Sequence, residues 1–342
     1  MHVPVVDRHQ KPLMPTTPSR AARWVKSGKA TPFWKRGVWC VRLNQDPSDD
    51  KTQDIAVGVD PGSKREGFTV KSEAHTYLNI QAHAVTWVKK HVEIRRHLRR
   101  ARRYRNTPCR QPRWSNRRKG RLAPSTRARW NWKLRILNWL AKMYPIDTVC
   151  VEDIKATTRK GRGGKWNASF SPLQVGKKYF YGEVRDKWTL EIYQGYETKA
   201  IRDDLGLKKT KGKLAAKFSA HCVDSWALAN DHVGGHISPD NEDMLLIKPI
   251  QFRRRQLHRQ NFKPGGIRSA YGSTRSLGFE RGSIVTHPKW GETYVGGTSK
   301  GRISLHCRKT GKRLCRNAKP VNITFRTYNS FTVGKVANSS TA

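Results

Sequence analysis

The sequence predicts a mixed α/β core within a very basic chain of 342 residues. Apolar runs of strand length cover residues 55–59, 67–71 and 77–85, and short turns separate them. These three runs predict an antiparallel meander. A fourth apolar run, 147–152, follows an amphipathic helical pattern at 125–143 that ends before a proline. Strands that alternate with helices favour an α/β sheet over an all-β or all-α fold.

The first 50 residues predict a small basic module with its own secondary structure. Pro12–Pro15 is expected to be extended, and Ser19 is the expected cap of a short helix over 20–27. Residues 38–43 predict a strand. The polar, acidic stretch 46–50 is interpreted as a linker to the core.

After the third strand, the chain enters a helix dominated by arginine. The arginines of this helix are Arg95, Arg96, Arg99, Arg100, Arg102, Arg103 and Arg105. Because they fall all around a helix of 3.6 residues per turn, the helix cannot bury one face against protein. We therefore expect anions to surround it. The Pro- and Arg-rich stretch 107–121 is expected to be irregular until it meets RNA or DNA.

The remaining elements alternate helix and strand and then become strand-rich. The expected helices and strand of the core are 173–188, 189–193 and 215–232, after a Gly- and Lys-rich loop at 156–169. The expected strands of the C-terminal region are 283–286, 292–296, 302–306 and 321–324. Short strands at this spacing predict a small barrel or sandwich.

Charge is the strongest compositional signal. Lys and Arg total 69 against 25 acids, a net charge of +44. Such an excess opposes the compact state unless a polyanion covers the surface, so composition favours a nucleic-acid partner over an ordinary cytosolic enzyme. Six cysteines without a Cys-x-x-Cys pair argue against structural zinc and favour a reducing cytoplasm. With no apolar leader and no run of ~20 apolar residues, a soluble, cytoplasmic protein without a membrane partner is expected.

Three acids occupy positions from which they can converge. Asp60 and Glu152 end predicted strands, and Asp224 lies on a late helix with His221 three residues earlier. Singly, each acid is more often a cap or an ion-pair partner, and a lone histidine is more often structural. Together, carboxylates at one point favour Mg²⁺ or Mn²⁺, and two such ions can clamp a scissile phosphate. His221 is then a candidate for the base that deprotonates water or for positioning the second ion.

The order of these motifs is similar to that of the ribonuclease-H-like nucleases of the RuvC type. Within them, the chain resembles the transposon-encoded, RNA-guided IscB/IsrB family. The motifs that carry the resemblance are Pro12–Pro15 (PLMP), Val57–Lys64, the helix Arg95–Arg105 (bridge helix), Val151–Asp153 and His221–Asp224. The interval 154–220 contains no histidine and is too short for an HNH nuclease domain. The resemblance is therefore to IsrB, the branch without HNH.

This resemblance implies a nickase of prokaryotic type that works as a monomeric ribonucleoprotein. It would bind a long non-coding guide RNA, open double-stranded DNA beside a target-adjacent motif and cut the displaced strand with two Mg²⁺ or Mn²⁺ ions. The implied catalytic residues are Asp60, Glu152, His221 and Asp224. Of these, Asp60, Glu152 and Asp224 are the implied metal ligands. The implied nucleic-acid contacts are Arg95, Arg96, Arg99, Arg100, Arg102, Arg103, Arg105, Arg110, Arg113, Arg117, Arg118, Arg253, Arg254 and Arg255.

The resemblance also implies a division into domains. The segments are a PLMP-like domain (1–50), the first RuvC segment (51–90), the bridge helix and basic segment (91–124), the second and third RuvC segments (125–247), a guide-RNA-contacting segment (248–274) and a β-rich domain for the target-adjacent motif (275–342). Two alternatives stay open. One is a guide-free RuvC-like transposon endonuclease or junction resolvase, and the other is a non-catalytic basic RNA-binding protein.

Overall fold

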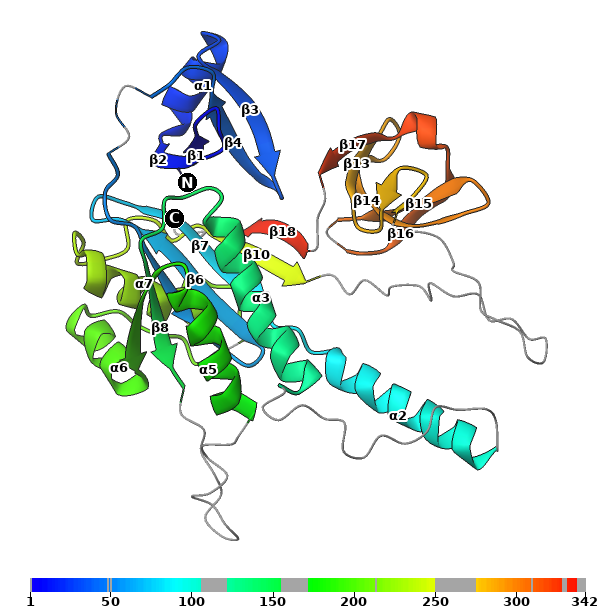
Figure 1. Cartoon of the computed structure of the whole chain (residues 1–342). Helices are drawn as coiled ribbons and strands as arrows, with labels where there is room; N and C mark the ends of the chain where they lie inside the picture. Colours follow the sequence, from blue (N-terminus) through cyan, green and yellow to red (C-terminus); the bar gives the residue numbers. More distant parts are fainter. Residues whose placement is uncertain are drawn as a thin grey trace. The chain divides into compact units, whose positions relative to one another are not determined.

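A computed structural model describes most of the chain and divides it into two compact units (Figure 1). The described residues are 2–47, 49, 51–105, 122–154, 172–212, 214–249, 275–308, 310–327 and 331–336. Unit 1 comprises Met1–Thr31, Val41–Leu246 and Lys335–Ala342, and unit 2 comprises Pro32–Cys40 and Ile247–Gly334. Among the described residues, no helix is both long and apolar enough to span a membrane.

The N-terminal region forms a four-stranded sheet with one helix. Its elements are β1 (Val3–Val6), β2 (Pro12–Thr16), α1 (Pro18–Lys26), β3 (Ala30–Lys35) and β4 (Val38–Leu43), and the strand order is β2-β1-β4-β3. The predicted strand 38–43 is confirmed. The predicted cap Ser19 is wrong: Thr17 accepts a hydrogen bond from the Arg20 amide, and Pro18 occupies the first helical turn. Proline at this position has the φ angle that a helix start needs, so the helix begins earlier.

A seven-stranded mixed sheet, most of which belongs to unit 1, confirms the α/β class. Its strands are β5 (Ala56–Asp60), β6 (Arg65–Lys71), β7 (Thr76–His83), β8 (Thr148–Asp153), β9 (Thr189–Gln194), β10 (Met244–Pro249) and β18 (Phe331–Val336). The strand order is β18-β10-β7-β6-β5-β8-β9. Strands β5, β6 and β7 form the predicted antiparallel meander, whereas β8 and β9 run parallel to β5. Every residue of β5 is buried, which explains its uninterrupted apolar run.

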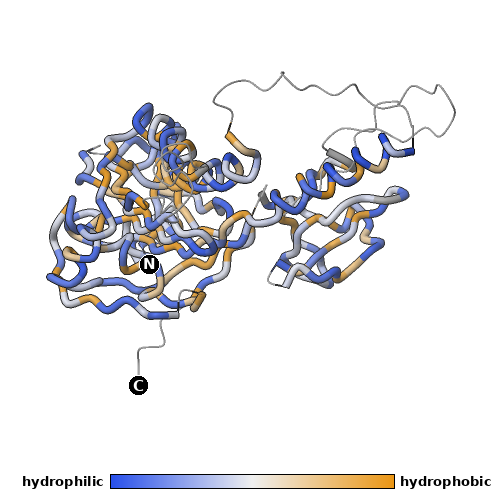
Figure 2. Tube along the Cα trace, turned by 90° about the horizontal axis from the view of Figure 1, so that it is seen from below, coloured by the Kyte–Doolittle hydropathy of each residue, from blue (hydrophilic) through white to orange (hydrophobic). Residues whose placement is uncertain are grey.

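Helices pack on both faces of this sheet (Figure 1). Helix α7 (Phe218–Val233) lies against the face to which Thr69 points, and the two are joined by a 2.9 Å hydrogen bond between Thr69 Oγ1 and Ser225 Oγ. Helix α3 (Pro124–Leu140) lies against the other face, where Lys133 Nζ is 2.7 Å from the fully buried Glu66. The alternation of side chains along β6 therefore assigns one helix to each face. Figure 2 shows apolar stretches running through this unit between hydrophilic ones.

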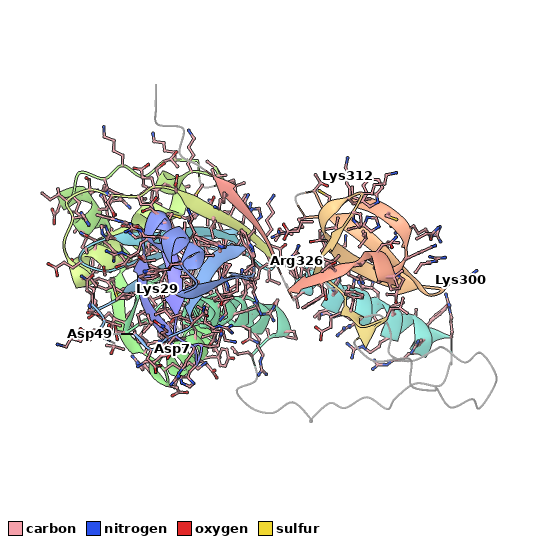
Figure 3. All side chains as sticks on the ribbon, turned by 90° about the horizontal axis from the view of Figure 1, so that it is seen from above. Asp7, Lys29, Asp49, Lys300, Lys312 and Arg326 are labelled. Atoms are coloured by element: carbon pink, nitrogen blue, oxygen red, sulfur yellow. The ribbon has the colours of Figure 1, made fainter. Side chains whose placement is uncertain are left out.

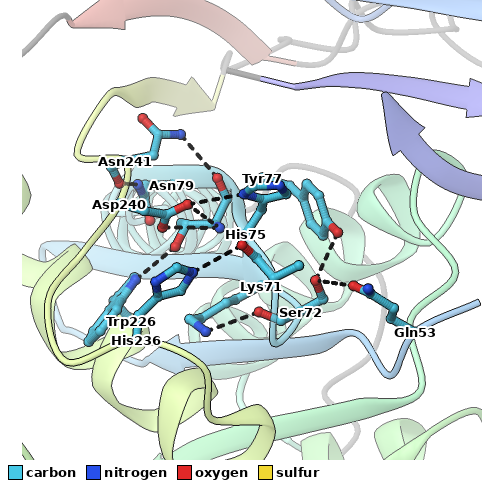
Figure 4. Close-up of polar contacts among 12 residues, drawn as sticks. Gln53, Lys71, Ser72, His75, Tyr77, Asn79, Trp226, His236, Asp240 and Asn241 are labelled. Carbon is cyan, nitrogen blue, oxygen red and sulfur yellow. Dashed lines mark hydrogen bonds and ion pairs between the residues drawn. The ribbon is translucent and has the colours of Figure 1, made fainter. Parts of the chain in front are cut away.

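Helix α7 and the segment that follows it make polar contacts with β7 (Figure 4). Trp226 Nε1 of α7 donates to Thr76 Oγ1 at 2.8 Å, and both carboxylate oxygens of Asp240 accept from the Thr76 amide. Asn79 Nδ2 donates to the Asn241 carbonyl at 2.7 Å. These contacts hold α7 in register with the meander, which is a condition for the site described below.

Three further helices of unit 1 differ in how well the sequence predicts them. Helix α2 (Val88–Tyr104) is the predicted arginine helix, and none of its residues is buried. Helix α6 (Gly195–Asp204) was not predicted. It starts directly after β9 through a capping box, in which the Gln194 backbone amide donates a hydrogen bond to Glu197 Oε2 at 2.5 Å. No glycine–proline turn separates strand from helix there, so the sequence carries no clear boundary signal. Helix α5 (Pro172–Arg185) packs on α3, with the Trp130 and Phe180 rings 5.0 Å apart.

Unit 2 contains a five-stranded sheet in the order β16-β15-β14-β13-β17, and a hairpin. Its elements are β11 (Arg275–Ser276), β12 (Phe279–Glu280), β13 (Ile284–His287), β14 (Gly291–Ser299), β15 (Arg302–Cys307), β16 (Arg313–Ala318), η1 (Pro320–Asn322) and β17 (Thr324–Thr327). The strand predicted at 321–324 is wrong, because Pro320 begins a 3₁₀ turn and the strand starts at Thr324. Figure 3 shows Lys300, Lys312 and Arg326 extending from this unit, and all three are exposed.

Candidate active site

Two of the predicted acids lie side by side because their strands are parallel neighbours. In the pairing of β5 with β8, Val59 is opposite Val151, so the next residues, Asp60 and Glu152, reach the same edge of the sheet. Asp224 approaches them from α7. One carboxylate oxygen from each of these three residues lies within 4.8 Å of the others. The structure therefore brings together the three acids that the sequence predicted to converge.

Two glycines allow α7 to come close enough to deliver Asp224. A Cβ atom on Gly58 would lie 1.8 Å from the Ser225 carbonyl oxygen, and one on Gly67 would lie 2.4 Å from that of His221. Any side chain at either position would push the helix off the sheet. Glycine in β5 and β6 is thus a requirement of the site, since it lets the helix backbone pack directly on the strands.

His221 is held by Asp60. Its Nδ1 atom is 2.7 Å from Asp60 Oδ2, and both side chains are largely buried. Because His221 and Asp224 are three residues apart on α7, they lie on one helix face, as predicted. The ring is oriented by a carboxylate in the way that histidines of metal and catalytic sites are.

Two cations that the sequence did not single out neutralise Asp224. Arg202 of α6 donates from its Nη1 to Asp224 Oδ1 at 2.7 Å, and Lys209 Nζ donates to Asp224 Oδ2. Arg202 lies on the helix that was not predicted. Lys209 lies in the basic stretch 208–213, which contains several lysines, so the sequence does not show which of them binds Asp224. Asp224 is therefore both a partner in salt bridges and a candidate metal ligand.

The charges of the site shift the pKa of its members. Burial, followed by the negative charges of Asp60 and Asp224, raises the pKa of Glu152 to about 7. Burial alone would lower the pKa of Lys209, but the three surrounding acids outweigh it and raise that pKa. The site thus carries more negative charge than its own cations neutralise.

The donor set fits a hard divalent cation. Asp60, Glu152 and Asp224 offer oxygen ligands only, which favours Mg²⁺ or Mn²⁺ over zinc. Burial and the charges of Asp60 and Asp224 raise the pKa of Glu152, and a cation bound at this point would favour its ionised form. We therefore regard the three acids as a candidate metal centre.

Asp153, which follows Glu152 in its motif, and the predicted arginines lie elsewhere. Asp153 points away from the centre and binds Lys177 Nζ at 2.5 Å and the Tyr181 hydroxyl at 2.8 Å, which ties β8 to α5. The predicted arginines among the described residues lie on α2, which is exposed, and Arg105 is the C-cap of that helix. They belong to unit 1 but are not part of the metal centre. Seven others lie outside the described residues: Arg110, Arg113, Arg117, Arg118, Arg253, Arg254 and Arg255.

Comparison with known families relates the first half of the chain to a single family. Residues 3–169 match a family described as RRXRR protein. The match covers just under half of the chain, and it includes the segment Arg99-Arg100-Ala101-Arg102-Arg103 of α2, which has the RRXRR pattern in the name of that family. A comparison with curated proteins gave no match.

Among solved structures, the chain is similar to Holliday junction resolvases. RuvC of T. thermophilus bound to its Holliday junction substrate is 12% identical, with a TM-score of 0.29 and coverage of 54% of this chain and 98% of that one. A further Thermus thermophilus RuvC structure is 14% identical, with a TM-score of 0.24 and coverage of 52% and 92%. The yeast mitochondrial resolvase Ydc2 is 11% identical, with a TM-score of 0.26 and coverage of 53% and 78%.

Proposed function

We propose that this protein is an RNA-guided DNA nickase with a ribonuclease-H-like core of the RuvC type. It binds a long non-coding guide RNA, recognises a target-adjacent motif and cuts the displaced, non-target DNA strand. The observation that carries the proposal is the convergence of three carboxylates within 4.8 Å, in the same compact unit as an exposed arginine-rich helix. The sheet order and the match to the RRXRR family support it.

In this proposal, Asp60, Glu152 and Asp224 hold two Mg²⁺ or Mn²⁺ ions. When bound, such ions supply electrostatic stabilisation of the charge on a scissile phosphate. His221 has the position of a general base. With its Nδ1 hydrogen donated to Asp60 at 2.7 Å, the Nε2 atom carries the lone pair that accepts a proton from water, and Asp60 stabilises the imidazolium that results.

Helix α2 is proposed to bind the guide RNA and its heteroduplex with the target strand. Its arginines are exposed on all sides, and an arginine guanidinium pairs with phosphate oxygens in a two-point geometry. In the proposed mechanism, sequence is read by base pairing, so the protein needs phosphate contacts rather than base contacts here.

The interval between Glu152 and His221 supports a single nuclease site. Of its described residues, α5 packs on α3, β9 extends the main sheet, and α6 supplies Arg202 to Asp224. These elements build the core, and the interval contains no histidine that could act as the base of an HNH site. We therefore propose that one strand is cut.

The first test is plasmid nicking. Full-length protein with guide RNA should nick a matched supercoiled plasmid in Mg²⁺, and Asp60→Ala should lose nicking while it retains RNA binding. Asp186→Ala, which removes an exposed acid at the end of α5, is the matched control and should nick normally. Equal nicking by Asp60→Ala and wild type would refute the site. Nicking without guide RNA would favour the guide-free endonuclease, and cutting of both strands would contradict the single-site argument.

The second test concerns α2. Replacing Arg99, Arg100, Arg102 and Arg103 with alanine should weaken RNA binding and reduce the slope of log affinity against log salt, by about 0.7–0.9 for each arginine–phosphate interaction removed. The matched control replaces the same four arginines with lysine, which keeps the charge. It should retain most of the slope. An alanine variant with an unchanged slope would show that these residues do not bind phosphate.

A further inference from the structure

A second cluster of metal-ligating side chains lies in the same unit, and the proposed nuclease function does not use it. Cys150 of β8, Glu191 of β9 and His232 of α7 each place one ligand atom within 4.8 Å of the others. Cys150 and Glu191 are opposite each other in the parallel pairing of β8 with β9. His232 lies in the last turn of α7. Three elements that are distant in sequence thus meet at one point.

The distances within this cluster are near those of a tetrahedral zinc site. Ligand bonds of about 2.0–2.3 Å imply separations of about 3.3–3.7 Å between ligand atoms. Cys150 Sγ is 3.6 Å from Glu191 Oε2, which already fits. His232 Nδ1 is 2.9 Å from the other oxygen of the same carboxylate, Glu191 Oε1, which is about 0.4 Å below this range, so binding an ion requires this pair to move apart.

Two neighbouring side chains hold the candidate ligands in place. The other ring nitrogen of His232, Nε2, is 3.0 Å from Asp54 Oδ2. A carboxylate on the far nitrogen fixes the tautomer in which Nδ1 is the ligand, as in carboxylate–histidine–zinc arrangements. The Tyr193 hydroxyl donates to Glu191 Oε2 at 2.9 Å and orients that carboxylate.

The types of ligand in the cluster and their exposure to solvent indicate which ion it would bind. A thiolate, an imidazole and a carboxylate together favour Zn²⁺, whereas the oxygen-only centre at Asp60 favours Mg²⁺. Cys150 is fully buried, while the side chains of His232 and Glu191 are 19% and 35% exposed, so the cluster is open to solvent on one side. Water is therefore available as the fourth ligand.

We propose that Cys150, Glu191 and His232 bind one Zn²⁺ ion, with Asp54 positioning His232. The ion would clamp α7 to β8 and β9. Because Cys150 precedes Glu152 by two residues and points to the same face of β8, the clamp would steady the strand and the helix that deliver Glu152 and Asp224. The zinc site does not depend on the proposed nickase function.

The experiment uses the full chain and Co²⁺ as a spectroscopic probe for zinc. Metal-free protein titrated with Co²⁺ should develop a thiolate-to-metal charge-transfer absorption that saturates at one ion per chain, and Zn²⁺ should abolish it. Cys150→Ala should reduce this absorption to background. Cys222→Ala, which removes another buried thiol of the same unit outside the cluster, should retain it in full.

Two further measurements keep the proposal falsifiable if Cys150→Ala does not fold. Asp60→Asn alters the acidic centre and should leave the absorption unchanged. In wild-type protein, a zinc chelator should lower the melting temperature, and Zn²⁺, but not Mg²⁺, should restore it. Absence of the absorption in wild type, its persistence in Cys150→Ala, or its loss in Cys222→Ala would each overturn the proposal. Absence of the absorption in wild-type protein would identify the cluster as a network of ion pairs and hydrogen bonds that does not bind a metal.

Discussion

Neutralising Glu152 should stabilise the metal-free protein, and the gain should depend on pH. The folded-state pKa of Glu152 is about 7, because burial and the neighbouring acids Asp60 and Asp224 disfavour its charge, against an ordinary value of 4.5. The protonated carboxyl therefore stabilises the fold fully below pH 4.5, and this contribution is lost as the pH rises to 7. The substitution Glu152→Gln keeps the shape of the side chain and removes the titration.

The magnitude follows from the two pKa values. The difference between about 7 and 4.5 is 2.5 pH units, and at about 1.36 kcal/mol per unit this corresponds to an upper bound of about 3 kcal/mol. Partial exposure of Glu152 to solvent reduces this bound, so we expect a gain on the order of 1–2 kcal/mol above pH 7. In a chain of this size, that gain raises the melting temperature by about 2–4 °C.

The assay is thermal unfolding in EDTA between pH 4.5 and pH 8.5. The melting-temperature difference between Glu152→Gln and wild type should grow through this range and level off above pH 7. Mg²⁺ should then raise the melting temperature of wild type more than that of the variant. The control Glu183→Gln removes an exposed acid of α5 and should show neither effect. A difference that does not vary with pH, or a variant less stable than wild type at pH 8, would refute the reasoning.

Two further predictions concern packing and buried charge. Gly67→Ala places a Cβ 2.4 Å from the His221 carbonyl oxygen, so it should destabilise unit 1 by about 1–3 kcal/mol or more and suppress metal-dependent cleavage. Gly182→Ala in α5, where a Cβ meets no atom within 4 Å, should instead stabilise by about 0.5–1 kcal/mol; equal melting temperatures for the two variants would contradict the close-packing argument. Lys133→Met leaves the fully buried Glu66 without its partner and should destabilise by about 3–5 kcal/mol, as measured by denaturant unfolding. The double variant Glu66→Leu/Lys133→Met should recover most of this loss, and a double variant as unstable as the single one would show that the ion pair is not the cause.

Features encoded by neighbouring residues could be predicted from the sequence. The apolar run that ends at Asp60 forms a fully buried strand, and the arginine pattern forms a helix with no buried residue. Boundaries were less accurate where a cap or proline redirected the chain, as at Thr17 and Pro320. Helix α6 was missed because its capping box follows β9 without a turn signal.

The cysteines illustrate the limit most clearly. Their spacing argued against a zinc site, since no two of them lie in a Cys-x-x-Cys pair. The structure places one of them, Cys150, beside Glu191 and His232. A ligand set assembled from two parallel strands and a helix leaves no spacing pattern, because its members are separated by whole elements.

The sequence by itself determined the α/β class, the three acids and the histidine of the candidate metal centre, and the basic character that calls for a polyanion. These follow from local periodicity, from strand ends and from composition. Tertiary structure alone decided that Arg202 and Lys209 lie on Asp224, that Asp153 turns toward Lys177, and that a cysteine joins a second cluster. The physical reason is that these contacts depend on sheet register and on the close approach of α7 across Gly58 and Gly67, which only long-range packing sets.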